Sequence, residues 1–288
     1  MLKISINGKK FRAPATWEDV TLEQCAWLSE KIGEQPEEIV EYYKSFASDD
    51  GVKLPNDMKA LEAFVAESIG YLLDLPNELR LQTRRGDIKT LGSAILPKFV
   101  LGALGYVDYQ VEGVKSFKHR RSTYLLPESG IDIGGQFTPL SKMTAIEACY
   151  LSDIVMARNI AFAPLAIAIA CRKKGEPYNE DVAQRRAADF KSLPASIYWE
   201  LQALVTAAHD YLRECYKASY GKGKKSGQGA STPMWSNTLV EMAVGKPSEL
   251  EVLHKMNFYD FVHLLNERNK TKQEEWKMKA ALSGCKLK

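Results

Sequence analysis

Residues 21–33, TLEQCAWLSEKIG, carry the clearest fold signal in the chain. Thr21 and Gln24 have the spacing of a capping box, in which the two side chains satisfy backbone amides at the start of a helix. The apolar residues that follow recur at helical spacing, and Gly33 is a typical helix end. They are Leu22, Cys25, Ala26, Leu28 and Ile32. The stretch predicts an amphipathic helix that buries one face.

The residues before this helix predict a β-hairpin. Leu2, Ile4 and Ile6 alternate with polar residues, and Asn7-Gly8 is a strong two-residue turn signal. Phe11 and Ala13 are expected on the return strand.

Further helices are expected after it, at 36–48 and 57–75, from their apolar periodicity. Segment 76–112 is broken by glycines, and Pro97 rules out one long helix there. A second β-bearing stretch covers about 113–140.

A faint internal similarity links two helix starts. Thr144 opens a helix with Glu147 at the capping-box spacing, as Gln24 follows Thr21. Residues 23–30 resemble residues 147–153 with one residue dropped. Chance likeness of two amphipathic helix starts and a duplicated β-then-helix unit both account for it.

The second half of the chain predicts three helices and a linker. An apolar helix at 160–171 ends at Arg172-Lys173-Lys174-Gly175, an amphipathic helix covers 178–190, and a long helix covers 194–220. The long helix has one apolar stripe of Ile197, Leu201, Leu204, Val205, Ala208, Leu212 and Cys215. Residues 221–231 are rich in Gly, Ser and Lys, as flexible linkers are.

Three helices are expected after the linker, at 234–244, at 247–256 and from Phe258 to about Ala281. Thr232-Pro233 is a start signal for the first, and Asn257 caps the last. The Lys/Glu-rich end of the last helix, Asn269 to Lys279, is either solvated or a partner-binding arm.

These elements predict a mainly α (α+β) fold: a helical body with two short β segments and a small C-terminal helical module after a flexible linker. The expected divisions are an N-terminal hairpin with helices at 1–112, a middle β segment with a helical domain at 113–220, a linker at 221–233 and the module at 234–288.

Composition indicates a folded protein of a reducing compartment. Of 288 residues, 45% are hydrophobic and 26% charged, which is ordinary for a globular chain. The five cysteines are widely spaced without a C-x-x-C motif, so free thiols are expected. Neither a signal peptide nor a membrane span is indicated, which predicts a cytoplasmic protein, and no membrane partner is expected.

No motif in the chain points to catalysis, a cofactor or a metal. The four histidines lack metal-ligand spacing, and neither a nucleophile elbow nor a phosphate loop is present. We therefore expect no catalytic, cofactor-binding or metal-binding residues and no small-molecule ligand, and we expect a non-enzymatic protein that binds other proteins. Net charge is only +3, so nucleic acid is a weak alternative that would use the basic residues at 115–121 and 222–225.

Several motifs resemble a family of phage proteins. Cys171-Arg172-Lys173-Lys174-Gly175-Glu176-Pro177-Tyr178, then Arg185-Arg186, then Phe190-Lys191-Ser192-Leu193-Pro194 follow a pattern found in tail-region proteins of phages and prophages of Bacteroidetes-type hosts. The opening Trp17 to Gln24 resembles the W-x-[DE]-[VIL]-T-L-x-Q start of such proteins. The C-terminal part is similar to the extension of tail assembly chaperones. Pro177 departs from the pattern.

The resemblance implies a tail assembly chaperone that holds the tape-measure protein and recruits tail tube subunits during virion assembly. The expected partners are therefore other phage proteins, and a homo-oligomer stays open. Candidate protein-interaction residues are Tyr198, Trp199, Trp235, Phe258, Tyr259, Phe261 and Leu265. One alternative is a structural virion component, such as a head–tail connector or tail adaptor, that stays in the particle.

Overall fold

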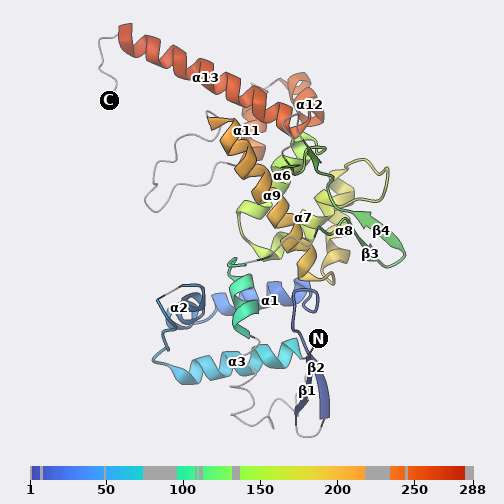
Figure 1. Ribbon diagram of the computed structural model, residues 1–288, viewed down its shortest axis with the longest axis vertical. Helices are drawn as coiled ribbons and strands as arrows, with labels where there is room; N and C mark the ends of the chain where they lie inside the picture. The colour runs from blue at the N-terminus through green and yellow to red at the C-terminus, as the bar shows by residue number, and fades with distance from the viewer. Residues whose placement is uncertain are drawn as a thin grey trace. The chain divides into compact units, whose positions relative to one another are not determined.

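A computed structural model of the chain is mainly α-helical, as the sequence predicts (Figure 1). The structure describes residues 2–6, 9–48, 50–73, 96–107, 109, 113–131, 137–217, 234–243 and 246–282. Its helices are α1 (Leu22–Gly33), α2 (Glu37–Lys44), α3 (Met58–Leu72), α6 (Ala145–Met156), α7 (Ala163–Ala170), α8 (Glu180–Phe190), α9 (Ala195–Cys215), α11 (Trp235–Met242), α12 (Pro247–Lys255) and α13 (Phe258–Leu282). Two short 3₁₀ turns are η1 (Ser45–Ala47) and η2 (Ile160–Phe162). Residues 96–103 are also helical.

Short strands form three antiparallel pairs in the described ranges. These are β1 (Leu2–Ile6) with β2 (Lys9–Ala13), β3 (Ser116–His119) with β4 (Ser122–Leu125), and β5 (Gly130–Ile131) with β6 (Phe137–Thr138). The two predicted β segments are therefore confirmed. The turn residues Asn7-Gly8 lie outside the described residues, as do the predicted linker at 221–231 and the Thr232-Pro233 start signal.

The chain divides into two compact units that alternate along the sequence. Unit 1 comprises Met1–Val114, Ala157–Ala168 and Asn179–Leu201, and unit 2 comprises Lys115–Met156, Ile169–Tyr178 and Gln202–Lys288. The sequence-based domain limits stay a prediction.

Unit 1 is organised by the predicted helix α1. The Thr21 hydroxyl accepts from the backbone amide of Gln24 at 3.2 Å, and the Gln24 side-chain oxygen accepts from the backbone amide of Thr21 at 2.9 Å. The capping box is therefore confirmed. The buried face consists of Leu22, Cys25, Leu28 and Ile32. Ala26 is only half-buried.

An aromatic cluster centred on Trp17 fills much of the unit 1 core. Its ring contacts Phe99 at 5.1 Å and Trp199 at 5.3 Å between centroids, both in edge-to-face geometry. A Cβ at Gly102 would lie 2.1 Å from the Trp17 ring, so glycine permits this close approach. Gly102 lies in segment 76–112, for which the sequence predicted no regular element. Residues 96–103 of that segment are helical, and this helix includes Pro97.

Unit 2 contains an ion pair whose carboxylate is buried. Glu147, which is 1% exposed, accepts from the Thr144 amide and pairs with the guanidinium of Arg172. The backbone of Arg172 forms an isolated antiparallel bridge with Leu125 at the end of β4. The segment after α7 is thus tied to the start of α6 by the ion pair and to the end of β4 by the bridge.

The helix predicted at 36–48 ends early, at Lys44, and so does the helix predicted at 194–220, whereas the apolar helix between them agrees with its predicted end. The apolar helix predicted at 160–171 starts with η2 and ends at Ala170, one residue from its predicted end, and Arg172 beyond it pairs with Leu125. Helix α9 ends at Cys215, which is exposed and therefore outside the predicted apolar stripe. The other six predicted stripe residues are buried: Ile197, Leu201, Leu204, Val205, Ala208 and Leu212.

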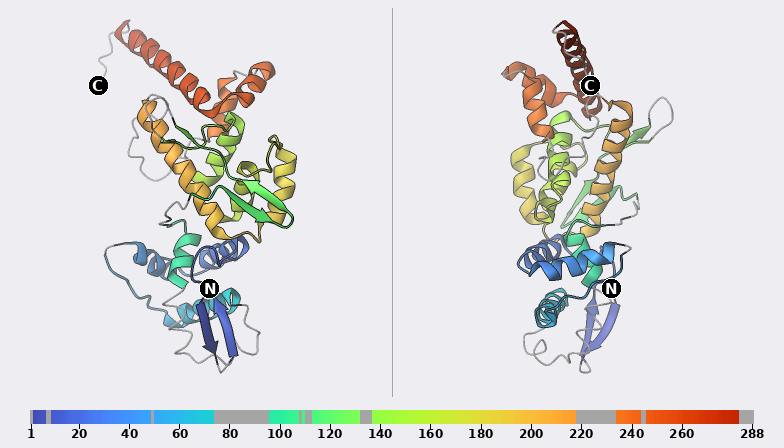
Figure 2. Two further views of the ribbon diagram at one scale, coloured as in Figure 1. Left: turned by 45° about the vertical axis from the view of Figure 1, so that its right-hand side comes forward. Right: turned by 90° about the vertical axis from the view of Figure 1, so that its left-hand side faces the viewer.

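Three helices close unit 2 at its C-terminal end. Helix α12 begins at Pro247, and the Asn257 side chain accepts from the Tyr259 amide to cap α13, as predicted. Figure 2 shows the second half of α13 extending clear of α11 and α12 in both views. Residues 270–279 of this helix are all exposed.

Candidate protein-binding groove

Helix α11 is held at its start by a residue of another helix. The carboxylate of Asp153 on α6 accepts from the Trp235 amide at 2.6 Å and from the Ser236 amide at 3.0 Å. The first amides of a helix have no partner within it, and a carboxylate there also interacts favourably with the helix dipole. Asp153 therefore does the work of an N-cap, and α11 packs against α6.

A buried histidine packs against the first residue of α11. His209 of α9 is 1% exposed, and its Nε2 lies 2.7 Å from the Ser152 hydroxyl. Ser152 donates its only proton to the Ala148 carbonyl at 2.6 Å, so it accepts from a protonated Nε2 of a neutral imidazole. The imidazole ring contacts Trp235 at 5.0 Å and Phe258 at 6.0 Å between centroids.

This environment favours the neutral imidazole strongly. Burial, helped by the neighbouring Arg213, lowers the pKa of His209 to about 4, against a smaller opposing effect of Asp210. The Ser152–His209 contact, which the sequence did not indicate, thus joins α6 to α9 next to the Trp235 ring.

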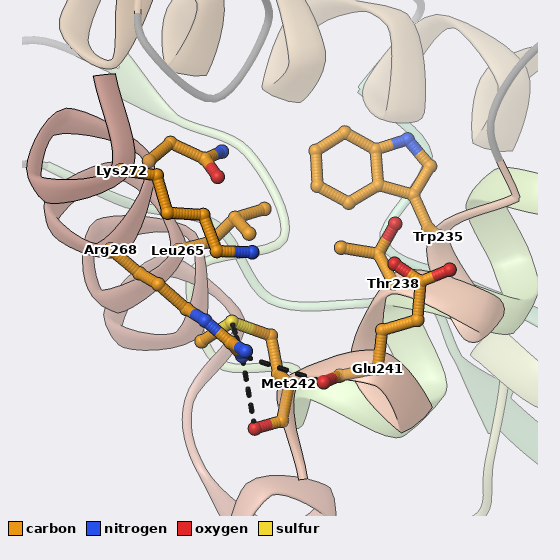
Figure 3. Close-up of a pocket in the computed structure, with 8 residues that line it drawn as sticks. Trp235, Thr238, Glu241, Met242, Leu265, Arg268 and Lys272 are labelled. Atoms are coloured by element: carbon orange, nitrogen blue, oxygen red, sulfur yellow. Dashed lines mark hydrogen bonds between the residues drawn. The ribbon is translucent and has the colours of Figure 1, made fainter. Parts of the chain in front are cut away.

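Helices α11 and α13 enclose a groove of about 260 Å³ (Figure 3). Eight residues line it: Trp235, Thr238, Glu241, Met242, Leu265, Arg268, Asn269 and Lys272. In Figure 3 the side chains of α13 face those of α11 across the opening.

Arg268 fixes one side of the groove. Its Nη1 donates to the carbonyl of Met242 at 3.2 Å and to that of Glu241 at 3.4 Å. Carbonyls at a helix C-terminus lack internal partners, so a cation there satisfies them and complements the dipole. Both ends of α11 are therefore held, by Asp153 at the first turn and by Arg268 at the last.

The groove combines apolar walls with charge at its rim. Trp235, Met242 and Leu265 offer apolar surface, while Arg268 and Lys272 face Glu241. Such a groove suits an apolar side chain of a helical partner, with charged groups that orient its neighbours.

The structure brings two of the seven predicted interaction residues to this groove, the half-buried Trp235 and Leu265, which is 7% exposed. Phe258 and Phe261 are 0% exposed and pack in the unit 2 core. Tyr259 is half-buried, and its hydroxyl donates to the Pro139 carbonyl at 2.7 Å.

The remaining two predicted residues belong to unit 1. Tyr198 is 1% and Trp199 2% exposed, and both lie in its aromatic core. Phe258 and Phe261, like Tyr198 and Trp199, have a packing role because their rings are buried. Contact of these four residues with another protein stays a prediction. Sequence reasoning missed Thr238, Glu241, Met242 and Arg268, although Arg268 follows Leu265 at the i, i+3 helical spacing.

The described residues also bear on metal binding, disulfide bonds and membrane insertion. Among the residues that the structure describes, no group of three His, Cys, Asp or Glu side chains is placed to hold a metal ion. No disulfide joins the four cysteines with described positions. In the same ranges, every helix is too short or too polar to cross a bilayer.

The chain was compared with family models, with curated proteins and with solved structures, and none of the three comparisons gave a match.

Proposed function

We propose that this protein is a non-enzymatic phage tail assembly chaperone-type protein that binds the tape-measure protein and tail tube subunits during virion assembly. The observation that carries the proposal is the groove between α11 and α13, which has apolar walls and is held at both ends of α11. The resemblance of the C-terminal part to tail assembly chaperone extensions adds to it.

A fixed groove suits a long helical client for a physical reason. An amphipathic helix presents apolar side chains every three or four residues, and one such anchor can enter a small groove while the others stay outside. Anchoring is stronger when the receptor is pre-organised, because binding then costs less conformational entropy. Asp153 and Arg268 pre-organise α11 by binding its first and last turns.

Co-expression tests this proposal. The chain would be produced with a candidate tape-measure protein, a long heptad-repeat chain from the same genome, and the complex recovered through a tag on that candidate. We expect co-purification of the wild type. Thr238→Arg, which fills the groove, should weaken binding at least tenfold.

Val240→Arg is the matched control, because Val240 lies on α11, is 54% exposed and does not line the groove. This variant should bind as the wild type does. Equal binding by both variants would exclude the groove, and no binding by the wild type would contradict the tape-measure proposal.

The virion-component alternative is separated by a different measurement. A transient chaperone should be absent from purified particles, whereas a connector or tail adaptor should be present at fixed stoichiometry. Quantitative mass spectrometry of purified virions distinguishes the two.

A further inference from the structure

A second cavity, of about 590 Å³, lies within unit 1. Its lining comes from α1, from Tyr71 of α3, and from Asn159 and Ala161. Trp27 and Tyr71 stack in it with centroids 4.2 Å apart and an interplanar angle of 22°. Both rings are half-buried, so each keeps an accessible edge or face.

The charged residues of this lining are both acidic. Glu23 and Glu30 are exposed, and neither carboxylate has a hydrogen bond or ion pair within the described part of the chain. Burial raises the pKa of the Tyr71 phenol, and the negative charge of the nearby Glu23 adds a smaller increase. Carboxylates beside stacked aromatic rings favour a cationic side chain whose aliphatic stem lies on the rings.

The acidic surface has a regular spacing along α1. Glu23, Trp27 and Glu30 stand at positions i, i+4 and i+7, so they share one face of the helix. With a rise of 1.5 Å per residue, the two carboxylates are about 10.5 Å apart along the axis, with the indole between them. We call these three residues the acidic stripe.

The exposed half of α13 repeats this spacing with the opposite charge. Lys272, Trp276 and Lys279 also stand at i, i+4 and i+7, and Trp276 is 63% exposed. Neither lysine has a hydrogen bond or ion pair in the part of the chain that the structure describes. We call these three residues the basic stripe. Glu275 lies at its edge, which leaves the surface net positive.

We propose that the acidic stripe of one molecule binds the basic stripe of a second copy of this chain. The two stripes match in spacing, in the position of the aromatic ring and in charge sign. The four charged residues and Trp276 are exposed and Trp27 is half-buried, so each stripe presents a large aromatic ring that would lose contact with water on binding. The indole of Trp276 would pack against the Trp27–Tyr71 pair while the lysines approach Glu23 and Glu30.

The equivalent face of unit 2 already holds a helix. Aligned by their caps, α1 and α6 place Glu30 where α6 has Asp153, and Trp27 where α6 has Tyr150. Asp153 holds the start of α11, and α11 packs against α6. The corresponding face in unit 1 borders the cavity of about 590 Å³.

The proposed contact joins two different surfaces, so after one contact forms each of the two molecules still has its other stripe free. Such a head-to-tail contact produces rings when the rotation closes and open chains when it does not. Lys272 also lines the α11–α13 groove, whereas the acidic stripe lies on α1, so variants of the acidic stripe test this contact separately from the proposed function.

Sedimentation velocity of the full chain tests the contact, from roughly micromolar to roughly 100 micromolar protein. The wild type should self-associate with rising concentration. Glu23→Lys with Glu30→Lys should weaken association at least tenfold, and so should Lys272→Glu with Lys279→Glu. All four residues are exposed, so both double variants should keep the wild-type helical circular dichroism.

Mixing the two double variants is the decisive arm. Each alone presents like charges at the contact, whereas the mixture presents opposite charges again, so association should return. Lys270→Glu with Lys277→Glu is the matched control, because these lysines have the same i, i+7 spacing on the opposite side of α13. That control should associate as the wild type does.

A wild type that stays monomeric throughout, or a mixture that does not associate, would overturn the proposal. A monomeric wild type whose sedimentation changes in the stripe variants would instead indicate binding within one chain, and would also overturn it. Because Glu23 and Glu30 are remote in sequence from the groove residues, Glu23→Lys with Glu30→Lys leaves the test of the proposed function unaffected.

Discussion

Thr144 and Asn257 pair their backbones in a single antiparallel bridge that joins the first residues of α6 and α13. The Ala145 amide donates to the Met256 carbonyl at 2.7 Å, and the Phe258 amide donates to the Met143 carbonyl at 3.0 Å. Thr21 and Pro194 form the same bridge in unit 1, between the starts of α1 and α9. Both units therefore contain two helices whose N-termini are linked by one bridged residue pair.

This recurrence supports a duplicated structural unit over chance likeness. The caps align 21–30 with 144–153 without a gap, so Gln24 matches Glu147, Ser29 matches Ser152, and Glu30 matches Asp153. The alignment with one residue dropped, which the sequence suggested, is therefore wrong by one position at its start. The shared cap geometry, not the cysteines, sets the register.

Removal of Asp153 should loosen α11. Asp153→Ala leaves the first amides of α11 without their acceptor, which should cost about 1 to 2 kcal/mol of unfolding free energy. Urea denaturation measures the loss, and hydrogen exchange at Trp235 and Ser236 should accelerate. Glu30→Ala is the matched control, since its carboxylate has no partner within the described ranges, and an equal loss in both variants would refute the capping role.

Loss of Arg172 should be more costly. Arg172→Ala leaves Glu147 buried without its cation, and breaking one side of a buried pair typically costs about 3 to 5 kcal/mol. The double variant Arg172→Met with Glu147→Gln removes both charges and should be more stable than Arg172→Ala. Chemical denaturation of the two variants would contradict this account if the double variant were the less stable one.

Stability should fall in mild acid because of His209. Its folded pKa of about 4 lies below the ordinary value of 6.5, so the neutral form is the one that folding favours. The resulting stabilisation is complete above pH 6.5 and is lost as the pH falls toward 4, by up to about 3 kcal/mol. Denaturation of wild type and His209→Gln at several pH values should show a shallower slope in the variant, and parallel slopes would contradict the assignment.

Thiol reactivity should separate the cysteines. Cys25, Cys149 and Cys171 are at most 1% exposed, and burial raises the pKa of the Cys25 thiol to about 12, whereas Cys215 is exposed. In a Cys285→Ser background, a thiol reagent should modify Cys215 quickly and the other three only after denaturation. Rapid modification of Cys25 in the folded protein would contradict the burial of α1.

Sequence pattern predicts the local elements of this protein well because their signals are local. The Thr21 capping box, the Asn257 cap and the alternation in β1 all lie within a few residues of the element that they define. The failures involve distant partners. Leu125 pairs with Arg172 just after α7, and no pattern around Arg172 reveals that contact.

The candidate site shows the same division. Trp235 and Leu265 stand out in sequence as apolar residues of a small helical module, and both line the groove. Asp153, Ser152 and His209, which support Trp235, come from helices that are far away in the sequence, so only the fold brings them together.

The groove between α11 and α13 is the central claim, and site-specific photocrosslinking tests it most directly. A photoreactive residue at Thr238 should crosslink to the co-expressed tape-measure protein, because position 238 lines the groove. The same residue at Val240, exposed outside the groove, should not. Crosslinks from position 240 but not from position 238 would contradict the account.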